Sequence, residues 1–230
     1  MKRSLVNQIM LDTKNFLNER KFHLPPFAYW TPNEWAQKGP EVREIVDNKL
    51  GWDITDFGRG DYDAFGLFLF TIRNGNPKDT RTGKPYCEKI LIVQPEQKTP
   101  MHFHWFKMED IINRGGGTAL LRLYNADKNE ELDQDKDVLV TIDGVKKSVK
   151  AGGVVELQPG ESITLLPYCY HEFWSPDGTV LLGEVSLVND DDHDNRFADP
   201  IGRFPAIEED EAPLHLLVND YPQYAPNVYR

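Results

Sequence analysis

The sequence has 230 residues, and its 37 acidic and 26 basic side chains leave a formal net charge of -11 at pH 7. This acidic balance, with no run rich in Lys and Arg, argues against nucleic acid and anionic membrane surfaces as partners, so we expect a small-molecule ligand. The length allows a full hydrophobic core, and we predict one domain over residues 1–230.

A helical extension is expected over residues 1–51. Apolar residues recur at near-helical spacing over residues 5–17. Further on, Thr31-Pro32-Asn33-Glu34 offers an N-cap hydroxyl, Pro at the first helical position and Glu where a capping box requires it. A second helix should therefore begin near Pro32 and end after Leu50, at Gly51.

From Trp52 onward the pattern becomes extended. The segment from Phe65 to Ile72 is apolar on both faces, as in a strand covered on both sides, and Asp143-Gly144 predicts a two-residue hairpin turn. Many short strands separated by Gly and Pro are typical of a jelly-roll sandwich or barrel, here over about residues 60–190, with a C-terminal segment over 191–230. The other expected strands are Lys89–Gln94, Met101–Trp105, Ala119–Tyr124, Val138–Ile142, Val145–Val149, Val154–Leu157, Ser162–Leu166, Glu172–Trp174 and Val180–Val188.

Two histidines, His102 and His104, lie two residues apart in an aromatic stretch. A strand projects residues i and i+2 from one face, so both imidazoles are expected to point into the same interior. Glu109 can return a carboxylate to that place if the chain turns there, and the glycines at 115–117 indicate a turn close behind. Three ligands would then come from one hairpin.

A fourth ligand, His171, follows a Pro-Gly turn and a short predicted strand. A single histidine in a strand is more often a hydrogen-bonded core residue than a ligand. Three His and one Glu together, however, make a nitrogen and oxygen set suited to Mn, Fe, Ni or Zn rather than to a structural cysteine zinc site. The sequence therefore predicts a divalent metal held by His102, His104, Glu109 and His171.

The two cysteines, Cys87 and Cys169, lie far apart in the sequence, which argues against a disulfide framework and indicates a reducing compartment. No apolar stretch is continuous enough for secretion or for crossing a membrane, so we predict a cytoplasmic protein with no membrane partner. The acidic run from Asp190 to Arg196 lacks EF-hand spacing and is interpreted as a polar loop at the barrel mouth.

Three stretches, residues 52–58 (Trp-Asp-Ile-Thr-Asp-Phe-Gly), residues 102–117 and residues 183–186 (Gly-Glu-Val-Ser), resemble a known family. Through them nearly all of the chain is similar to the cupin-type D-lyxose isomerases. The cupin signature itself is met in part, since Glu96 stands where it usually begins with Gly. The four ligand types keep their order, so the resemblance implies an all-β cupin jelly-roll barrel with an N-terminal helical extension.

The resemblance also implies an activity: an aldose-ketose isomerase that interconverts D-lyxose and D-xylulose, and often D-mannose and D-fructose, on a bound Mn²⁺. The four ligands would leave two positions open for O1 and O2 of an open-chain sugar, where the metal polarises the carbonyl and stabilises a cis-enediol. The expected partners are a sugar substrate and, in a homodimer, a second copy of the chain.

Moving the carbonyl from C1 to C2 requires a base that carries a proton between these carbons. Lys107 shares the side of Glu109 in an extended segment, so its ammonium is expected to hydrogen-bond the sugar oxygens, the alternative being an exposed solubilising lysine. Lys89 is a second candidate of the same kind. Arg196, or one of the aspartates in the run from Asp190 to Arg196, is a candidate for contacting the distal hydroxyls.

The base is where the chain departs from the family pattern. The family usually has Glu at the position of Ala206, and that Glu resembles the proton-transferring residue, whereas alanine carries no proton. Natural variation with another base and an inactivating substitution are both open, and Glu184 is the substitute that we would test first. If position 206 takes part, Ala206→Glu should raise turnover by orders of magnitude at unchanged metal content.

Two other functions fit the same residues. A cupin dioxygenase would hold Fe²⁺ with the same three His and one Glu and would consume oxygen. A non-enzymatic sugar-binding cupin would bind its ligand without forming a ketose, even after Ala206→Glu.

Overall fold

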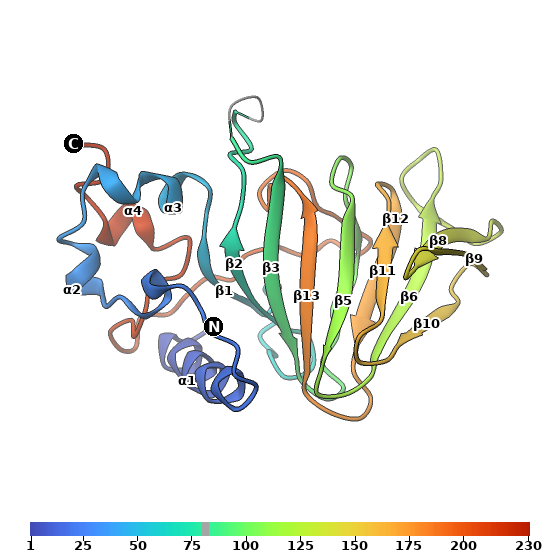
Figure 1. The fold of residues 1–230 in the computed structure, drawn as a ribbon, viewed down its shortest axis with the longest axis horizontal. Helices are drawn as coiled ribbons and strands as arrows, with labels where there is room; N and C mark the ends of the chain where they lie inside the picture. Colours follow the sequence, from blue (N-terminus) through green and yellow to red (C-terminus); the bar gives the residue numbers. More distant parts are fainter. Residues whose placement is uncertain (80–82) are drawn as a thin grey trace.

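The computed structural model describes residues 1–79 and 83–230, and it consists of two β-sheets with helices gathered at one end (Figure 1). The strands of the larger sheet follow the order β1-β2-β3-β13-β5-β11-β8-β9, and those of the smaller sheet the order β10-β6-β12-β4-β14, with β7 beside β6. The bounds in the larger sheet are β1 Gly51–Thr55, β2 Leu67–Arg73, β3 Tyr86–Val93, β13 Val180–Leu187, β5 Glu109–Gly115, β11 Ser162–Leu165, β8 Val138–Ile142 and β9 Val145–Val149. Those in the smaller sheet are β10 Val154–Leu157, β6 Ala119–Ala126, β12 Cys169–Trp174, β4 Thr99–Phe103, β14 Arg196–Phe197 and β7 Leu132–Asp133.

The inner faces of the two sheets share one hydrophobic core. Alternating strand residues point inward, so Leu91 and Leu182 of the larger sheet pack in the same cluster as Leu121 and Leu123 of the smaller one. This arrangement confirms the all-β jelly-roll prediction. The hydrophobic cluster gives way to polar side chains where His102 enters the interior, which places the candidate site inside the barrel.

Helix α1 (Arg3–Glu19) confirms the first predicted helix, and it covers part of the outer face of the larger sheet. Its buried side includes Val6, Met10 and Leu17, in one cluster with Phe68 and Phe70 of β2. The extension therefore shields an apolar face of the sheet that would otherwise meet water.

The second predicted helix is only partly correct. It begins at Pro32 with the expected capping box between Thr31 and Glu34, but α2 ends at Trp35. The reason is Gly39-Pro40, since proline lacks the N–H that a helix needs and disfavours helical backbone before it. The remainder forms short pieces rather than one helix to Leu50, and Gly51 opens β1. These pieces are a 3-10 turn at Pro40–Val42 and α3 at Arg43–Asp47, with a further 3-10 turn at Pro26–Tyr29 and α4 at Tyr221–Tyr224 elsewhere in the chain.

Three expected strands, β8, β9 and β10, have the predicted bounds, and the Asp143-Gly144 turn has the positive φ values of 46° and 82° that its hairpin requires. Both cysteines are free and buried. Burial raises the pKa of the Cys87 thiol to about 12, so it stays protonated at neutral pH. Within the part of the chain that is described, no helix combines the length and apolar character needed to cross a membrane.

Candidate active site

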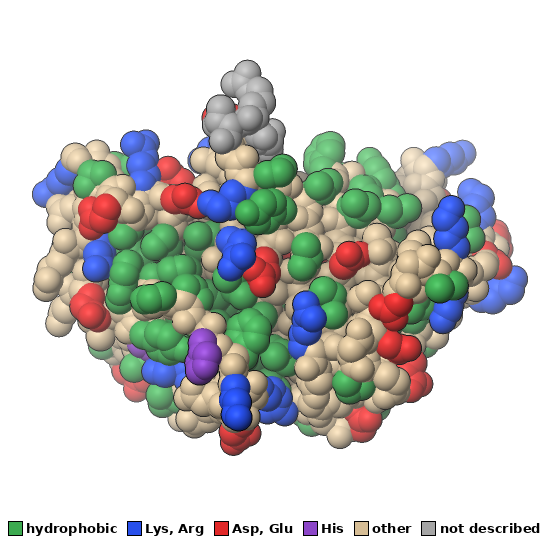
Figure 2. All heavy atoms as spheres, viewed as in Figure 1, with side chains coloured by type: hydrophobic (Ala, Val, Ile, Leu, Met, Phe, Trp, Pro, Cys, Tyr) green, Lys and Arg blue, Asp and Glu red, His purple; other side chains and the backbone are tan. Residues whose placement is uncertain are grey.

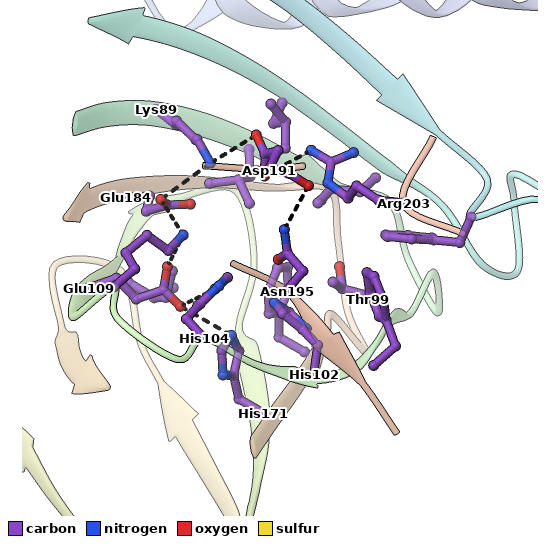
Figure 3. Close-up of a pocket in the computed structure, with 18 residues that line it drawn as sticks. Lys89, Thr99, His102, His104, Glu109, His171, Glu184, Asp191, Asn195 and Arg203 are labelled. Carbon is purple, nitrogen blue, oxygen red and sulfur yellow. Dashed lines mark hydrogen bonds and ion pairs between the residues drawn. The ribbon is translucent and has the colours of Figure 1, made fainter. Parts of the chain in front are cut away.

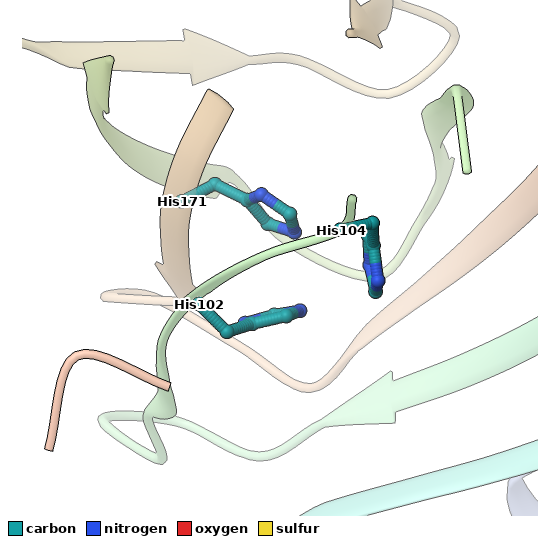
Figure 4. A group of neighbouring side chains, drawn as sticks. All are labelled: His102, His104 and His171. Atoms are coloured by element: carbon teal, nitrogen blue, oxygen red, sulfur yellow. The ribbon is translucent and has the colours of Figure 1, made fainter. Parts of the chain in front are cut away.

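Two adjacent strands of the smaller sheet bring three histidines together. His102 on β4 lies directly opposite His171 on β12 in the antiparallel register, and their ring centroids are 4.2 Å apart. His104 follows β4 by one residue, with its ring centroid 5.2 Å from that of His102. Figure 4 shows the three rings turned toward one point. All three side chains are buried, and their ring nitrogens approach within the spacing of a metal site.

Glu109 reaches the same point from the other sheet. It is the first residue of β5 in the larger sheet, whereas His102 lies on β4 in the smaller one. The prediction that one hairpin supplies three ligands is therefore wrong, because the chain crosses between sheets after Phe103. Asp194 holds this crossing, since its carboxylate accepts the backbone N–H groups of Phe106 and Lys107 at 3.0 and 2.9 Å.

Hydrogen bonds fix the tautomer of each imidazole. The Nδ1 atoms of His102, His104 and His171 lie 2.8, 2.5 and 3.0 Å from the backbone carbonyl oxygens of Pro100, Asp194 and Cys169. A carbonyl oxygen only accepts, so each Nδ1 carries the proton and donates it. Each Nε2 of a neutral ring therefore presents a lone pair, which is the usual way in which a protein prepares histidines for a metal.

A carboxylate oxygen faces these lone pairs. Glu109 Oε1 lies 3.1 Å from His171 Nε2 and 3.4 Å from His104 Nε2. It is buried and has no hydrogen-bond partner, as expected if both nitrogens are unprotonated. Lone pairs converging without a proton between them repel one another, and a divalent cation removes that repulsion. These four residues can therefore hold a metal ion.

The charges around the site agree with this tautomer assignment. Burial and the neighbouring histidines lower the pKa of His102 well below its ordinary value. Burial raises the pKa of Glu109, but the neighbouring Lys107 ammonium lowers it, and the net shift is well downward. Neutral imidazoles and an ionised carboxylate are the protonation states that bind metal.

A row of alternating charges extends from Glu109 along the cavity wall (Figure 3). Lys107 Nζ lies 2.8 Å from Glu109 and 2.9 Å from Glu184. Beyond these, Lys89 Nζ lies 3.5 Å from Glu184 and 3.7 Å from Asp191. Burial lowers the pKa of Lys107, yet the three carboxylates Glu109, Glu184 and Asp191 outweigh it, and the net shift is upward. Its ammonium therefore stays charged inside the protein.

The row ends at Arg203. Its Nη2 lies 3.4 Å from Asp191 and donates a 2.6 Å hydrogen bond to Asp53. Phe57, Phe173 and Phe197 are among the apolar residues that line the cavity beside the row. A cavity with apolar walls and a few convergent polar groups is the usual form of a small-molecule site.

Two predicted site residues lie outside this cavity. Arg196 pairs with Glu130 and Glu131 and is not among the lining residues. Ala206 is exposed, and its carbonyl accepts a 2.8 Å hydrogen bond from the amino group of Met1. The geometry therefore favours Glu184 over position 206 for proton transfer. The other predicted residues, namely Lys89, Lys107, Glu184 and the four predicted ligands, line the cavity together.

Sequence reasoning missed some lining residues and predicted another only in general terms. Asp191 belongs to the acidic run of which one aspartate was expected, as an alternative to Arg196, to contact the sugar, and it follows β13, the strand that carries Glu184. Its neighbours Asp190, Asp192 and His193 form a separate and more exposed cluster. Thr99 and Arg203 had no signal of their own, because an isolated Thr and an Arg in an irregular segment fit no periodic pattern.

Known proteins resemble this chain throughout its length. The family model described as D-lyxose isomerase matches residues 1–221. A D-lyxose/D-mannose isomerase of Escherichia coli O157:H7 is 50% identical over 227 residues, which covers 97% of this chain and 100% of that protein. The D-lyxose/D-mannose isomerase of Serratia proteamaculans is 50% identical over 224 residues, with 96% and 98% covered.

Solved structures share the fold at low sequence identity. L-ribose isomerase of Cellulomonas parahominis with L-ribose superimposes with a TM-score of 0.61 at 16% identity, covering 90% of this chain and 98% of that one. The Acinetobacter sp. DL28 L-ribose isomerase in complex with L-ribose gives 0.58 at 17% identity, with the same coverage. The family match and the two relatives that are 50% identical show that the chain belongs to the D-lyxose isomerase family.

Proposed function

We propose that this protein interconverts D-lyxose with D-xylulose and D-mannose with D-fructose, using a divalent metal, Mn²⁺ by preference. The observation that carries the proposal is the meeting of three imidazole lone pairs and the orphaned Glu109 oxygen beside Lys107 and Glu184. A metal held there by His102, His104, Glu109 and His171 supplies a Lewis acid for the sugar carbonyl.

Proton transfer falls to Glu184 in this proposal. Its carboxylate takes the proton from C2 of the open-chain aldose and returns it to C1 on the same face, through a cis-enediol. Lys107 donates a hydrogen bond to the oxygen on which negative charge develops, while the hydroxyl proton passes from O2 to O1 beside it. Burial of both side chains, 4% exposed each, excludes water that would exchange the carried proton.

The test is a product assay on Mn²⁺-loaded protein with D-lyxose and D-mannose, run without oxygen and resolved by chromatography. D-xylose is the matched control, because it differs from D-lyxose only in configuration at C2. A base on one side of the sugar can remove the C2 proton of only one of these two epimers. We expect ketose from D-lyxose and D-mannose and little from D-xylose. Loss of activity without oxygen would support a dioxygenase, and sugar binding with no ketose would support a binding protein.

We further propose a homodimer formed through the outer face of the larger sheet, next to the part that α1 covers. Tyr86, Val185 and Leu187 are 44%, 45% and 46% exposed there, and one oxygen of neighbouring Asp110 is buried without a partner. Figure 2 shows hydrophobic side chains on this face, where β3, β13 and β5 lie. Light scattering should give twice the chain mass, and Val185→Asp should halve it, whereas Val145→Asp on β9 should not. A monomeric wild-type protein would contradict this.

A cytoplasmic location is part of the same proposal. It is supported by the two cysteines, Cys87 and Cys169, which are both free, as is usual in a compartment that keeps thiols reduced.

A further inference from the structure

Four buried side-chain atoms lack a hydrogen-bond partner among the described residues, and three of them belong to residues that line the candidate cavity. Glu109 Oε1 would be satisfied by the proposed metal. The other two are Thr99 Oγ1 and Arg203 Nη1. Buried polar groups without a partner destabilise a fold, so each such group in a binding cavity calls for an explanation by ligand or solvent.

Neither residue is loosely held. Thr99 is 1% exposed and opens β4, the strand that carries His102. The Arg203 side chain is 10% exposed, and its Nη2 is fixed by Asp53 and Asp191. The guanidinium is therefore held in place through Nη2 while Nη1 has no partner. A donor fixed in this way needs no reorganisation to bind a ligand.

Both groups lie across the cavity from Glu109. Arg203 is the last member of the charge row that begins at Glu109, with Glu184 and Asp191 between them. In Figure 3, Arg203 and Thr99 are on the side of the cavity opposite Glu109 and Glu184. An open-chain sugar with O1 and O2 at the metal would extend its remaining carbons toward this side.

We propose that Arg203 Nη1 and Thr99 Oγ1 form a subsite for the distal hydroxyl groups of an open-chain polyhydroxy ligand, those beyond C3. This inference rests on the proposed function for the direction of the sugar but not for the existence of the subsite. Arg203 only donates, whereas the Thr99 hydroxyl both donates and accepts, so together they satisfy hydroxyls in either role. Both act by positioning the sugar and take no part in proton transfer.

Thr99→Val is the most direct variant, because it keeps the side-chain shape and removes a hydroxyl that has no protein partner. We expect the thermal midpoint to stay the same or rise, since a buried unsatisfied group disappears. Binding of D-arabitol, the unreactive alcohol of D-lyxose, to Mn²⁺-loaded protein should weaken about 5- to 10-fold. Thr141→Val on β8 is the matched control, because Thr141 does not line the cavity.

Arg203→Lys is the second variant. Its ammonium can replace Nη2 next to Asp53 and Asp191, but nothing then replaces Nη1. We expect D-arabitol to bind about 10-fold or more weakly, since hydrogen bonds from charged donors are the stronger ones. Glycerol, which lacks the distal hydroxyls, should bind equally to the wild type and to both variants, and metal content should not change.

Calorimetric titration with D-arabitol and glycerol tests the proposed subsite without requiring turnover. Selective loss of D-arabitol binding in both variants supports the subsite. Unchanged D-arabitol affinity, equal losses for both ligands, or a wild-type protein that does not bind D-arabitol overturns it. If the wild type binds D-arabitol but forms no ketose from D-lyxose, the isomerase proposal fails while the subsite is still judged by the variants. For an active enzyme, the variants should raise KM for D-lyxose more than they lower kcat.

Discussion

Two arginines that pair with carboxylates, the buried Arg3 and the largely buried Arg203, are bonded in different ways. Arg3 is completely buried, and Nε, Nη1 and Nη2 donate four hydrogen bonds to the carboxylates of Glu209 and Asp220, at 2.6 to 3.0 Å. Arg203 has two carboxylates within 4 Å as well, but both contacts use Nη2 and leave Nη1 unpartnered. Arg3 holds α1 against the C-terminal segment, whereas Arg203 retains an unpaired hydrogen-bond donor that a ligand could use.

The difference shows how structural and functional buried charges can be told apart. A buried ion pair contributes to stability only when its remaining donors and acceptors are satisfied, as they are at Arg3. In the cavity, Glu109, Thr99 and Arg203 each retain an unsatisfied atom, which costs stability unless a ligand is bound. Variants of the cavity should therefore change binding and turnover, and variants at Arg3 should change stability.

The largest effect is expected from His171→Ala. Losing one nitrogen ligand should lower the affinity for Mn²⁺ and reduce kcat/KM for D-lyxose by about 10³-fold or more at limiting metal. Metal analysis and a product assay measure both effects. The control is His193→Ala, because His193 is exposed and pairs with Asp190 outside the cavity. Equal activity in these two variants would remove His171 from the site.

A second large effect should follow from Glu184→Gln. The amide keeps the shape but cannot carry the proton, so kcat should fall about 10²- to 10⁴-fold with metal content retained. A variant at position 206 provides the comparison, because Ala206 is exposed and lies outside the cavity. Ala206→Glu should change kcat far less than Glu184→Gln, and a large gain from it would return the base to that position.

Arg3→Met should lower stability without changing substrate binding in the cavity. Removing the cation leaves the carboxylates of Glu209 and Asp220 without their partner, and the free energy of unfolding should fall by about 3 kcal/mol, as seen when buried pairs are broken. Urea unfolding measures this change. The folded variant should keep the KM of the wild type for D-lyxose, and an increased KM would mean that the α1 region contributes to the cavity.

The smallest expected effect is a change in stability at acidic pH. A hydrogen bond from Arg3 lowers the pKa of Glu209, so the stabilisation from this pair is present above the unfolded pKa of about 4.5 and is lost as pH falls through the folded value. Glu209 is half exposed, and solvent screening keeps its contribution to about 1 kcal/mol or less. The stability difference between wild type and Arg3→Met should therefore narrow below pH 4. A difference that widens in acid would contradict this assignment.

Much of the fold was predictable from the sequence, because strand and helix periods reflect local contacts. The capping box at Thr31 and the hairpin at Asp143-Gly144 are local signals, and both appear as expected. The crossing of the chain between sheets after Phe103 was missed, since nothing local distinguishes a hairpin from a crossover. The four proposed ligands were predicted by residue type and spacing, whereas Thr99 and Arg203 meet only through the tertiary fold.

The central claim, that the three histidines and Glu109 hold one divalent ion that activity requires, is tested most directly by titrating Mn²⁺ into chelator-stripped protein. Electron paramagnetic resonance of the free ion and the D-lyxose assay would be followed together. We predict that one equivalent of Mn²⁺ per chain disappears from the free-ion signal and that turnover rises in proportion. A signal unaffected by the protein, or full turnover in the stripped protein, would contradict the claim.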